Sequence, residues 1–79
     1  MHDHLASLVV QVRPERQDAL CAALDRMGVE VHAAQGGKLV VTIEAPDEAA
    51  LADTMNRMNL LDGVYSATLV FHSYEGASP

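Results

Sequence analysis

A glycine pair near the middle of the chain is the feature that most restricts the fold. Gly36 and Gly37, within the segment QGGK, can adopt the positive φ angles of a two-residue hairpin turn. On either side, residues 29–34 (VEVHAA) and 38–44 (KLVVTIE) alternate side chains with the period of a β-strand. The sequence therefore predicts an antiparallel strand pair at the centre of the chain.

The segments before and after this hairpin have apolar residues at helical spacing. The first helix is predicted to begin at Pro14, because a missing N–H costs nothing at a first helical position, and to end before Gly28. The second is predicted to begin at Asp47, whose carboxylate suits the helix N-terminal dipole. The residues at helical spacing are Leu20, Leu24 and Met27 in the first helix and Leu51, Met55 and Met58 in the second.

Two outer strands complete the pattern. Residues 5–12 (LASLVVQV) predict the first strand, and residues 61–74 (LDGVYSATLVFHSY) contain the last one, after a turn at Asp62 and Gly63. The resulting order, β-α-β-β-α-β, is the ferredoxin-like split βαβ arrangement. Right-handed crossovers then predict an α+β sandwich, with an antiparallel sheet ordered 4-1-3-2 and two helices on one face.

Alternation within the strands sorts their side chains onto two faces. The face under the helices is predicted to hold Ala6, Leu8, Val10, Leu39, Val41, Ile43, Ala67, Leu69 and Phe71. The other face, here called the open face, is predicted to hold Ser7, Val9, Gln11, Val40, Thr42, Ser66, Thr68, Val70 and His72, flanked by Glu30, His32, Lys38 and Glu44. In the second strand, Ala33 is predicted to share a side with Val29 and Val31. The open face has an apolar centre and hydrogen-bonding surroundings, so it is either an ordinary solvent-facing surface or a shallow docking surface.

Composition limits the class of protein. The 79 residues leave room for one domain, which we expect to span 1–79, with order over about 5–74 and a flexible tail at 75–79. Eleven acids against five bases, and two Tyr, one Phe and no Trp, disfavour nucleic acid as a partner. No run approaches the about 18 apolar residues of a membrane span, and no secretory signal is recognised. The single Cys21 fits a reducing compartment, so we expect the cytoplasm.

Residues that carry catalytic or metal chemistry do not form a motif. The glycine pair lacks the Lys-Ser/Thr of a phosphate-binding loop, and Cys21 has neighbours that suggest a half-buried hydrophobic role. His2 and His4 are at the terminus, and His32 and His72 are predicted on opposite edge strands. We therefore expect a protein that is not an enzyme and needs no metal or other cofactor.

Three segments together carry a family resemblance. They are residues 7–11 (SLVVQ), the hairpin VEVHAA with GKLVVTIEA, and residues 62–72 (DGVYSATLVFH). In this order and spacing the chain, from Leu5 to His72, resembles NapD, the small cytoplasmic maturation chaperone of periplasmic nitrate reductase. The resemblance implies a ferredoxin-like fold that binds the twin-arginine signal peptide of the catalytic subunit NapA as a helix against the sheet. It also implies that export waits until the molybdenum cofactor is inserted and the enzyme is folded.

The resemblance makes the open face the expected peptide site. An acidic protein also suits a peptide that carries paired arginines. Glu44, with Glu30 as a second candidate, would meet the arginines, because an arginine–carboxylate pair can be bidentate. The expected peptide-binding residues are Ser7, Val9, Gln11, Val40, Thr42, Glu44, Ser66, Thr68, Val70 and His72.

Two other classes of protein share part of this pattern. A small-molecule regulatory module of the ACT type has the same order of elements, but VRPER stands where its glycine-rich ligand loop would follow the first strand. A metal or redox carrier of similar fold would need paired cysteines in that loop. Exposed edges at the second and fourth strands are compatible with a monomer or a weak homodimer formed by strand pairing.

Overall fold

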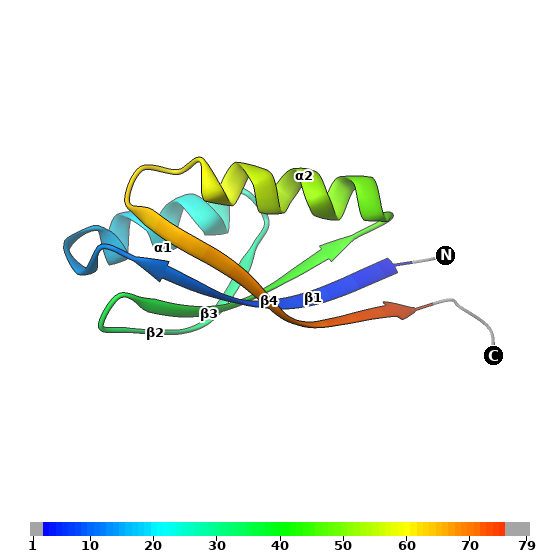
Figure 1. Ribbon diagram of the computed structural model, residues 1–79, viewed down its shortest axis with the longest axis horizontal. Helices are drawn as coiled ribbons and strands as arrows, with labels where there is room; N and C mark the ends of the chain where they lie inside the picture. The colour runs from blue at the N-terminus through cyan, green and yellow to red at the C-terminus, as the bar shows by residue number, and fades with distance from the viewer. Residues whose placement is uncertain (1–2, 76–79) are drawn as a thin grey trace.

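One antiparallel sheet and two helices make up the fold. The computed structural model describes residues 3–75, with the side chains of residues 4–71. The sheet order is β2-β3-β1-β4, and both helices lie on one side of the sheet (Figure 1), so the predicted ferredoxin-like α+β sandwich is confirmed. The elements are β1 (Asp3–Val12), η1 (Pro14–Arg16), α1 (Gln17–Arg26), β2 (Glu30–Gln35), β3 (Lys38–Ala45), α2 (Glu48–Asn59) and β4 (Val64–Glu75).

The ends of the chain differ in detail from the sequence prediction. β1 begins at Asp3, and His4 lies in it as a buried residue. Asp3 pairs with Glu75, the last residue of β4, so the first and last strands run beside each other over their whole length. The rest of the expected flexible tail, 76–79, lies outside the described residues.

The hairpin turn between β2 and β3 is attached to the rest of the fold. Gly36 and Gly37 have φ values of 59° and 83°, as a two-residue turn requires. The Gly37 N–H donates to Gln17 Oε1 at 2.8 Å, and its carbonyl accepts from the Val12 N–H at 2.8 Å. A Cβ at Gly37 would lie 2.6 Å from the Val12 carbonyl oxygen, so only glycine fits there.

The two helices begin in different ways. Pro14 opens the 3₁₀ turn η1, and the α-helix proper begins only at Gln17. At α2 the predicted start is confirmed, because Asp47 is the N-cap and its Oδ1 accepts a hydrogen bond from the Ala50 N–H at 2.7 Å. Both helices bury residues at helical spacing, Leu20 and Leu24 in α1 and Leu51 and Met58 in α2, as the sequence predicted.

The core lies between the helices and the two central strands. Leu24 of α1 and Met58 of α2 are fully buried in it. The side chains predicted to face the helices from β1 and β3 are all buried, namely Ala6, Leu8, Val10, Leu39, Val41 and Ile43. Ala67 of β4 is half-buried against them.

The register of β4 against β1 shifts at Tyr65 and again at Val70. Because the shift at Val70 is a β-bulge that changes the phase of the strand, the prediction that Phe71 faces the helices is wrong. Leu8 pairs with Leu69, but Ser7 pairs with Phe71, which leaves Val70 as an extra residue. Beyond the bulge the faces exchange, and Phe71 lies opposite Ser7 on the open face with 55% of its surface exposed. Leu69 keeps the core side but is 43% exposed, because β4 is an edge strand.

The other edge strand, β2, also contains a bulge. Val31 pairs with Val41, and Ala33 pairs with Val40, so His32 is the extra residue of β2. The prediction that Ala33 shares a side with Val29 and Val31 is therefore wrong, since Ala33 lies opposite Val40 on the open face. Bulges in edge strands also hinder pairing with the strands of another molecule.

Phe71→Ala tests the bulge in β4. Because the side chain is about half exposed, we expect the substitution to lower the free energy of unfolding by about 1 kcal/mol. A phenylalanine buried in the core would cost about 3–5 kcal/mol. The measurement is the denaturant midpoint, with Leu39→Ala as the buried reference. A loss as large as that of Leu39→Ala would place Phe71 in the core after all.

Candidate functional site

The sheet surface opposite the helices is the candidate site, and the strand register sets out its side chains in rows. Across the middle, Val9 pairs with Val40 on one side and with Thr68 on the other. Towards the chain ends come the rows Thr42–Ser7–Phe71 and Glu44–Leu5, and in the other direction the row Lys38–Gln11–Ser66. Neighbouring side chains on one sheet face lie within contact distance, so these rows form a continuous surface.

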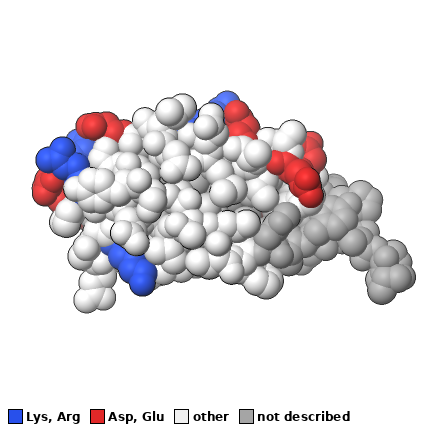
Figure 2. All heavy atoms as spheres, in the orientation of Figure 1, with Lys and Arg blue, Asp and Glu red and all other residues white. Residues whose placement is uncertain are grey.

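Apolar side chains occupy the middle and the β4 side of the open face. Val40 is 37% exposed, Val9 is half-buried, and Val70 and Phe71 are exposed at the β4 edge. The β4 bulge sets Val70 and Phe71 together opposite Ser7, which widens the apolar area by an aromatic ring. Figure 2 shows the molecule from the side, with the helices above the sheet, and the charged side chains in this view gather towards the ends of the molecule and the helices.

A hollow of about 320 Å³ lies at the β2–β3 corner of the open face. Within it, a hydrogen bond joins His32 Nε2 and Thr42 Oγ1 at 2.8 Å, and the same nitrogen lies 3.6 Å from Glu30 Oε1. His32 is the extra residue of the β2 bulge, and it lies beside Glu30, as the alternation in the sequence predicted. The residues that line this corner hollow are Leu5, Gly28, Glu30, His32, Thr42 and Glu44.

Eight of the ten predicted site residues lie together on the open face. Val70 is the extra residue of the β4 bulge and is exposed. His72 pairs with Ala6 through its backbone, and its side chain lies outside the described ones. The eight are Ser7, Val9, Gln11, Val40, Thr42, Glu44, Ser66 and Thr68.

Three open-face side chains were missed from the sequence. Leu5 lies two residues before Ser7 and pairs with Glu44, so continuing the alternation by one step would have found it. Ala33 and Phe71 reach the open face only through the bulges, and neither bulge has a glycine or proline in the sequence to signal it.

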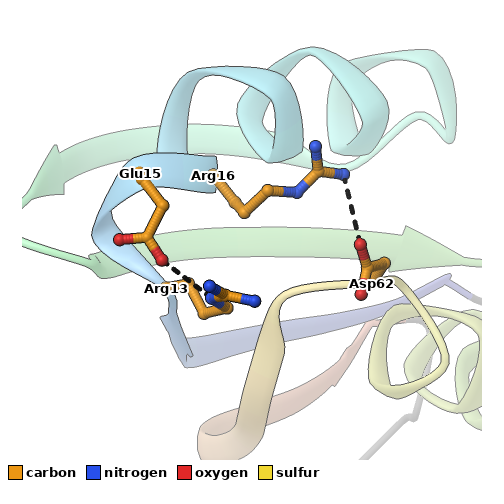
Figure 3. A network of polar contacts seen from close by, with 4 residues as sticks. All are labelled: Arg13, Glu15, Arg16 and Asp62. Carbon is orange, nitrogen blue, oxygen red and sulfur yellow. Dashed lines mark hydrogen bonds and ion pairs between the residues drawn. The ribbon is translucent and has the colours of Figure 1, made fainter.

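Paired charges occupy the opposite end of the molecule, where β1 leads into η1. Arg13 Nε donates to Glu15 Oε1 at 2.7 Å, and Arg16 Nη2 lies 3.8 Å from Asp62 Oδ2 (Figure 3). The hydrogen bond raises the pKa of Arg13 and lowers the pKa of Glu15. An ACT-type module would place its ligand loop at this junction. In this chain, the two arginines at the junction, Arg13 and Arg16, are paired with carboxylates.

Groups able to do redox or metal chemistry are not assembled in the part of the chain that the structure describes. Burial, with a smaller contribution from Asp18, raises the pKa of the Cys21 thiol, so the reactive thiolate is disfavoured. Among residues 3–75 no three His, Cys, Asp or Glu side chains are grouped as metal ligands. Within the same residues no helix is long and apolar enough to cross a membrane.

A two-layer sandwich with one covered and one half-apolar, uncovered sheet face defines a small binding module. The family model described as "NapD protein" matches residues 4–76. The chain therefore belongs to the NapD family, whose curated relatives are named as chaperones and not as enzymes. The ACT-type alternative was based only on a shared order of strands and helices. The match to the NapD family model is more specific, so we no longer consider that alternative.

Relatives in two bacteria and a solved structure support this assignment. Chaperone NapD of Paracoccus pantotrophus is 35% identical over 69 residues, which are 86% of this chain and 62% of that protein. The chain thus spans less than two thirds of this relative. Chaperone NapD of Escherichia coli K12 is 34% identical over 74 residues, 90% of this chain and 85% of the relative. The solution structure of the E. coli Tat proofreading chaperone protein NapD superposes with a TM-score of 0.83 at 31% identity, covering 98% of this chain and 84% of that one.

Proposed function

We propose that this protein is a cytoplasmic chaperone of nitrate reductase maturation that binds the twin-arginine signal peptide of NapA on its open face. Bound peptide would be withheld from the Tat export machinery until the cofactor is inserted and the enzyme is folded. The observation that carries the proposal is the uncovered sheet face, where Val40 and Phe71 expose apolar surface in the middle of hydrogen-bonding side chains. The solved relative is described as a Tat proofreading chaperone, which supports the same function.

The open face suits an amphipathic peptide with a cationic end. An apolar helix face can pack on Val9, Val40 and Phe71, as helical peptides do on apolar grooves. The net charge of −6 attracts a basic peptide electrostatically before the two molecules are in contact. The bulges in β2 and β4 hinder pairing at the sheet edges, so we expect one peptide to bind one chaperone chain.

Titration calorimetry with the NapA signal peptide tests this function. We expect saturable one-to-one binding, and weaker binding of a control peptide whose two arginines are lysines, because a lysine cannot form the planar two-bond contact with a carboxylate. Equal affinity for both peptides would remove the requirement for twin arginines. A complete absence of binding of the arginine peptide would contradict the proposed function.

A further inference from the structure

We propose that the corner hollow is the subsite for one arginine guanidinium of the bound peptide, and that this fixes the direction of the peptide on the sheet. The cationic end would lie over β2 and β3, and the apolar segment would run across β1 towards β4. The inference rests on the proposed function and adds to it a residue-level site and an orientation. Its basis is the distribution of acceptors, apolar surface and charge over the open face.

Two carboxylates lie close to each other at the hollow. Glu30 pairs with Thr42, and Glu44 follows Thr42 by two residues on the same face of β3. Glu30 and Glu44 are therefore diagonal neighbours across two strands, at about 7–8 Å between backbones, which is within reach of long side chains. A flat guanidinium inserted between them can donate hydrogen bonds to both carboxylates.

The lining of the hollow matches the parts of an arginine side chain. Carboxylate oxygens of Glu30 and Glu44, with the Thr42 hydroxyl, are acceptors for a guanidinium, which carries several N–H donors and no acceptor. Leu5, half-buried beside Glu44, offers apolar surface to the aliphatic stem of the arginine. The hollow thus combines an acidic rim with an apolar contact.

Neither Glu30 nor Glu44 is paired with an arginine or lysine side chain in the described part of the chain. Glu44 makes no ion pair or hydrogen bond with another described side chain. Glu30 Oε1 lies 3.6 Å from His32 Nε2, which is within ion-pair distance. Because two carboxylates at this spacing repel each other, a cation placed between them is favoured.

The far end of β3 and the β4 edge both disfavour a cationic segment. Lys38 begins β3 on the same face as Glu44, about 20 Å away along the strand, and repels a cationic segment. Val70 and Phe71 lie at the β4 edge and offer contact to apolar side chains only. A peptide with a basic end and an apolar segment therefore has one orientation that matches charge with charge and apolar surface with apolar surface.

A double-mutant cycle by calorimetry tests the subsite. The chaperone variants are Glu44→Gln and Glu30→Gln, and the peptides are the NapA signal peptide and two versions with one arginine each changed to glutamine. We expect each carboxylate variant to weaken binding of the natural peptide about two- to fivefold, and both together about tenfold. The loss should vanish for the peptide that lacks the matching arginine. Glu48→Gln, which removes an exposed charge from α2, should leave affinity unchanged.

A spin-label measurement checks the orientation without altering the hollow. A nitroxide placed just before the arginine pair should broaden the amide signals of Glu30, Thr42 and Glu44, and one at the far end of the apolar segment should broaden those of Thr68 to Phe71. The reverse pattern, or an equal loss from Glu48→Gln and Glu44→Gln, would overturn the subsite while peptide binding itself stands. If the natural peptide does not bind the unaltered protein, the proposed function fails and the subsite fails with it.

Discussion

Leu8→Ala is expected to lower the free energy of unfolding by about 2–5 kcal/mol. The side chain lies in β1, one of the two central strands, and is fully buried between the sheet and the helices. Removing it leaves a cavity lined by residues held in their own strands and helices, so the surroundings can collapse only in part. In a small domain such a loss is a large fraction of the total stability.

Two further leucines make this experiment a graded series. Leu69 pairs with Leu8 but is 43% exposed, and Leu60 at the end of α2 is 76% exposed. Denaturant unfolding of the three alanine variants should therefore rank the losses Leu8, then Leu69, then Leu60, with Leu60→Ala close to the unaltered protein. A loss for Leu69→Ala equal to that for Leu8→Ala would mean that Leu69 is as deeply buried as Leu8 and is not exposed at the sheet edge.

Val40→Asp is expected to weaken binding of the NapA signal peptide at least about tenfold, or about 1.4 kcal/mol. The side chain is 37% exposed at the centre of the open face, so aspartate replaces apolar contact with a charge that the peptide would have to desolvate. The helix-covered core is on the other face, so we expect the circular dichroism spectrum and the melting temperature to change little. Affinity is measured by calorimetry on the folded variant.

The control for Val40→Asp is Ala52→Asp, which adds the same charge to the exposed surface of α2. We expect this control to bind the peptide like the unaltered protein. If Val40→Asp remains folded and keeps full affinity, the peptide does not bind on the sheet face. A decrease of equal size in the control would assign the effect to net charge and not to the open face.

The central half of the sheet could be predicted from residue pattern alone. Residues such as Leu39, Val41 and Ile43 alternate without interruption, and the turn at Gly36 and Gly37 fixes which strand residues face each other. The start of α2 at Asp47 was also predictable, because a capping carboxylate precedes the apolar spacing. The turn and the helix start depend on residues that are close in sequence. The buried face of β3 depends on a two-residue alternation without interruption. Both kinds of feature can therefore be predicted from the sequence.

The edges of the sheet could not be predicted in the same way. A bulge adds one residue to a strand, and every side chain beyond it changes face. Val70 and His32, the extra residues, are ordinary strand residues, so nothing in their chemistry marks them. The open face therefore includes Phe71 and Ala33, and its apolar area extends further towards β4 than alternation alone predicts.

The pairing of β1 with β4 affects how the protein folds during its synthesis. These strands are the first and last of the chain, so their contact closes a loop that includes nearly every other element. Contacts so distant in sequence form late and slow the folding of small domains. Since synthesis proceeds from the N-terminus, the row Val40–Val9–Thr68 is incomplete on the ribosome until the final strand has emerged. A partly synthesised chain therefore lacks the complete open face, and under the proposed function it could bind a signal peptide only after the last strand has joined the sheet.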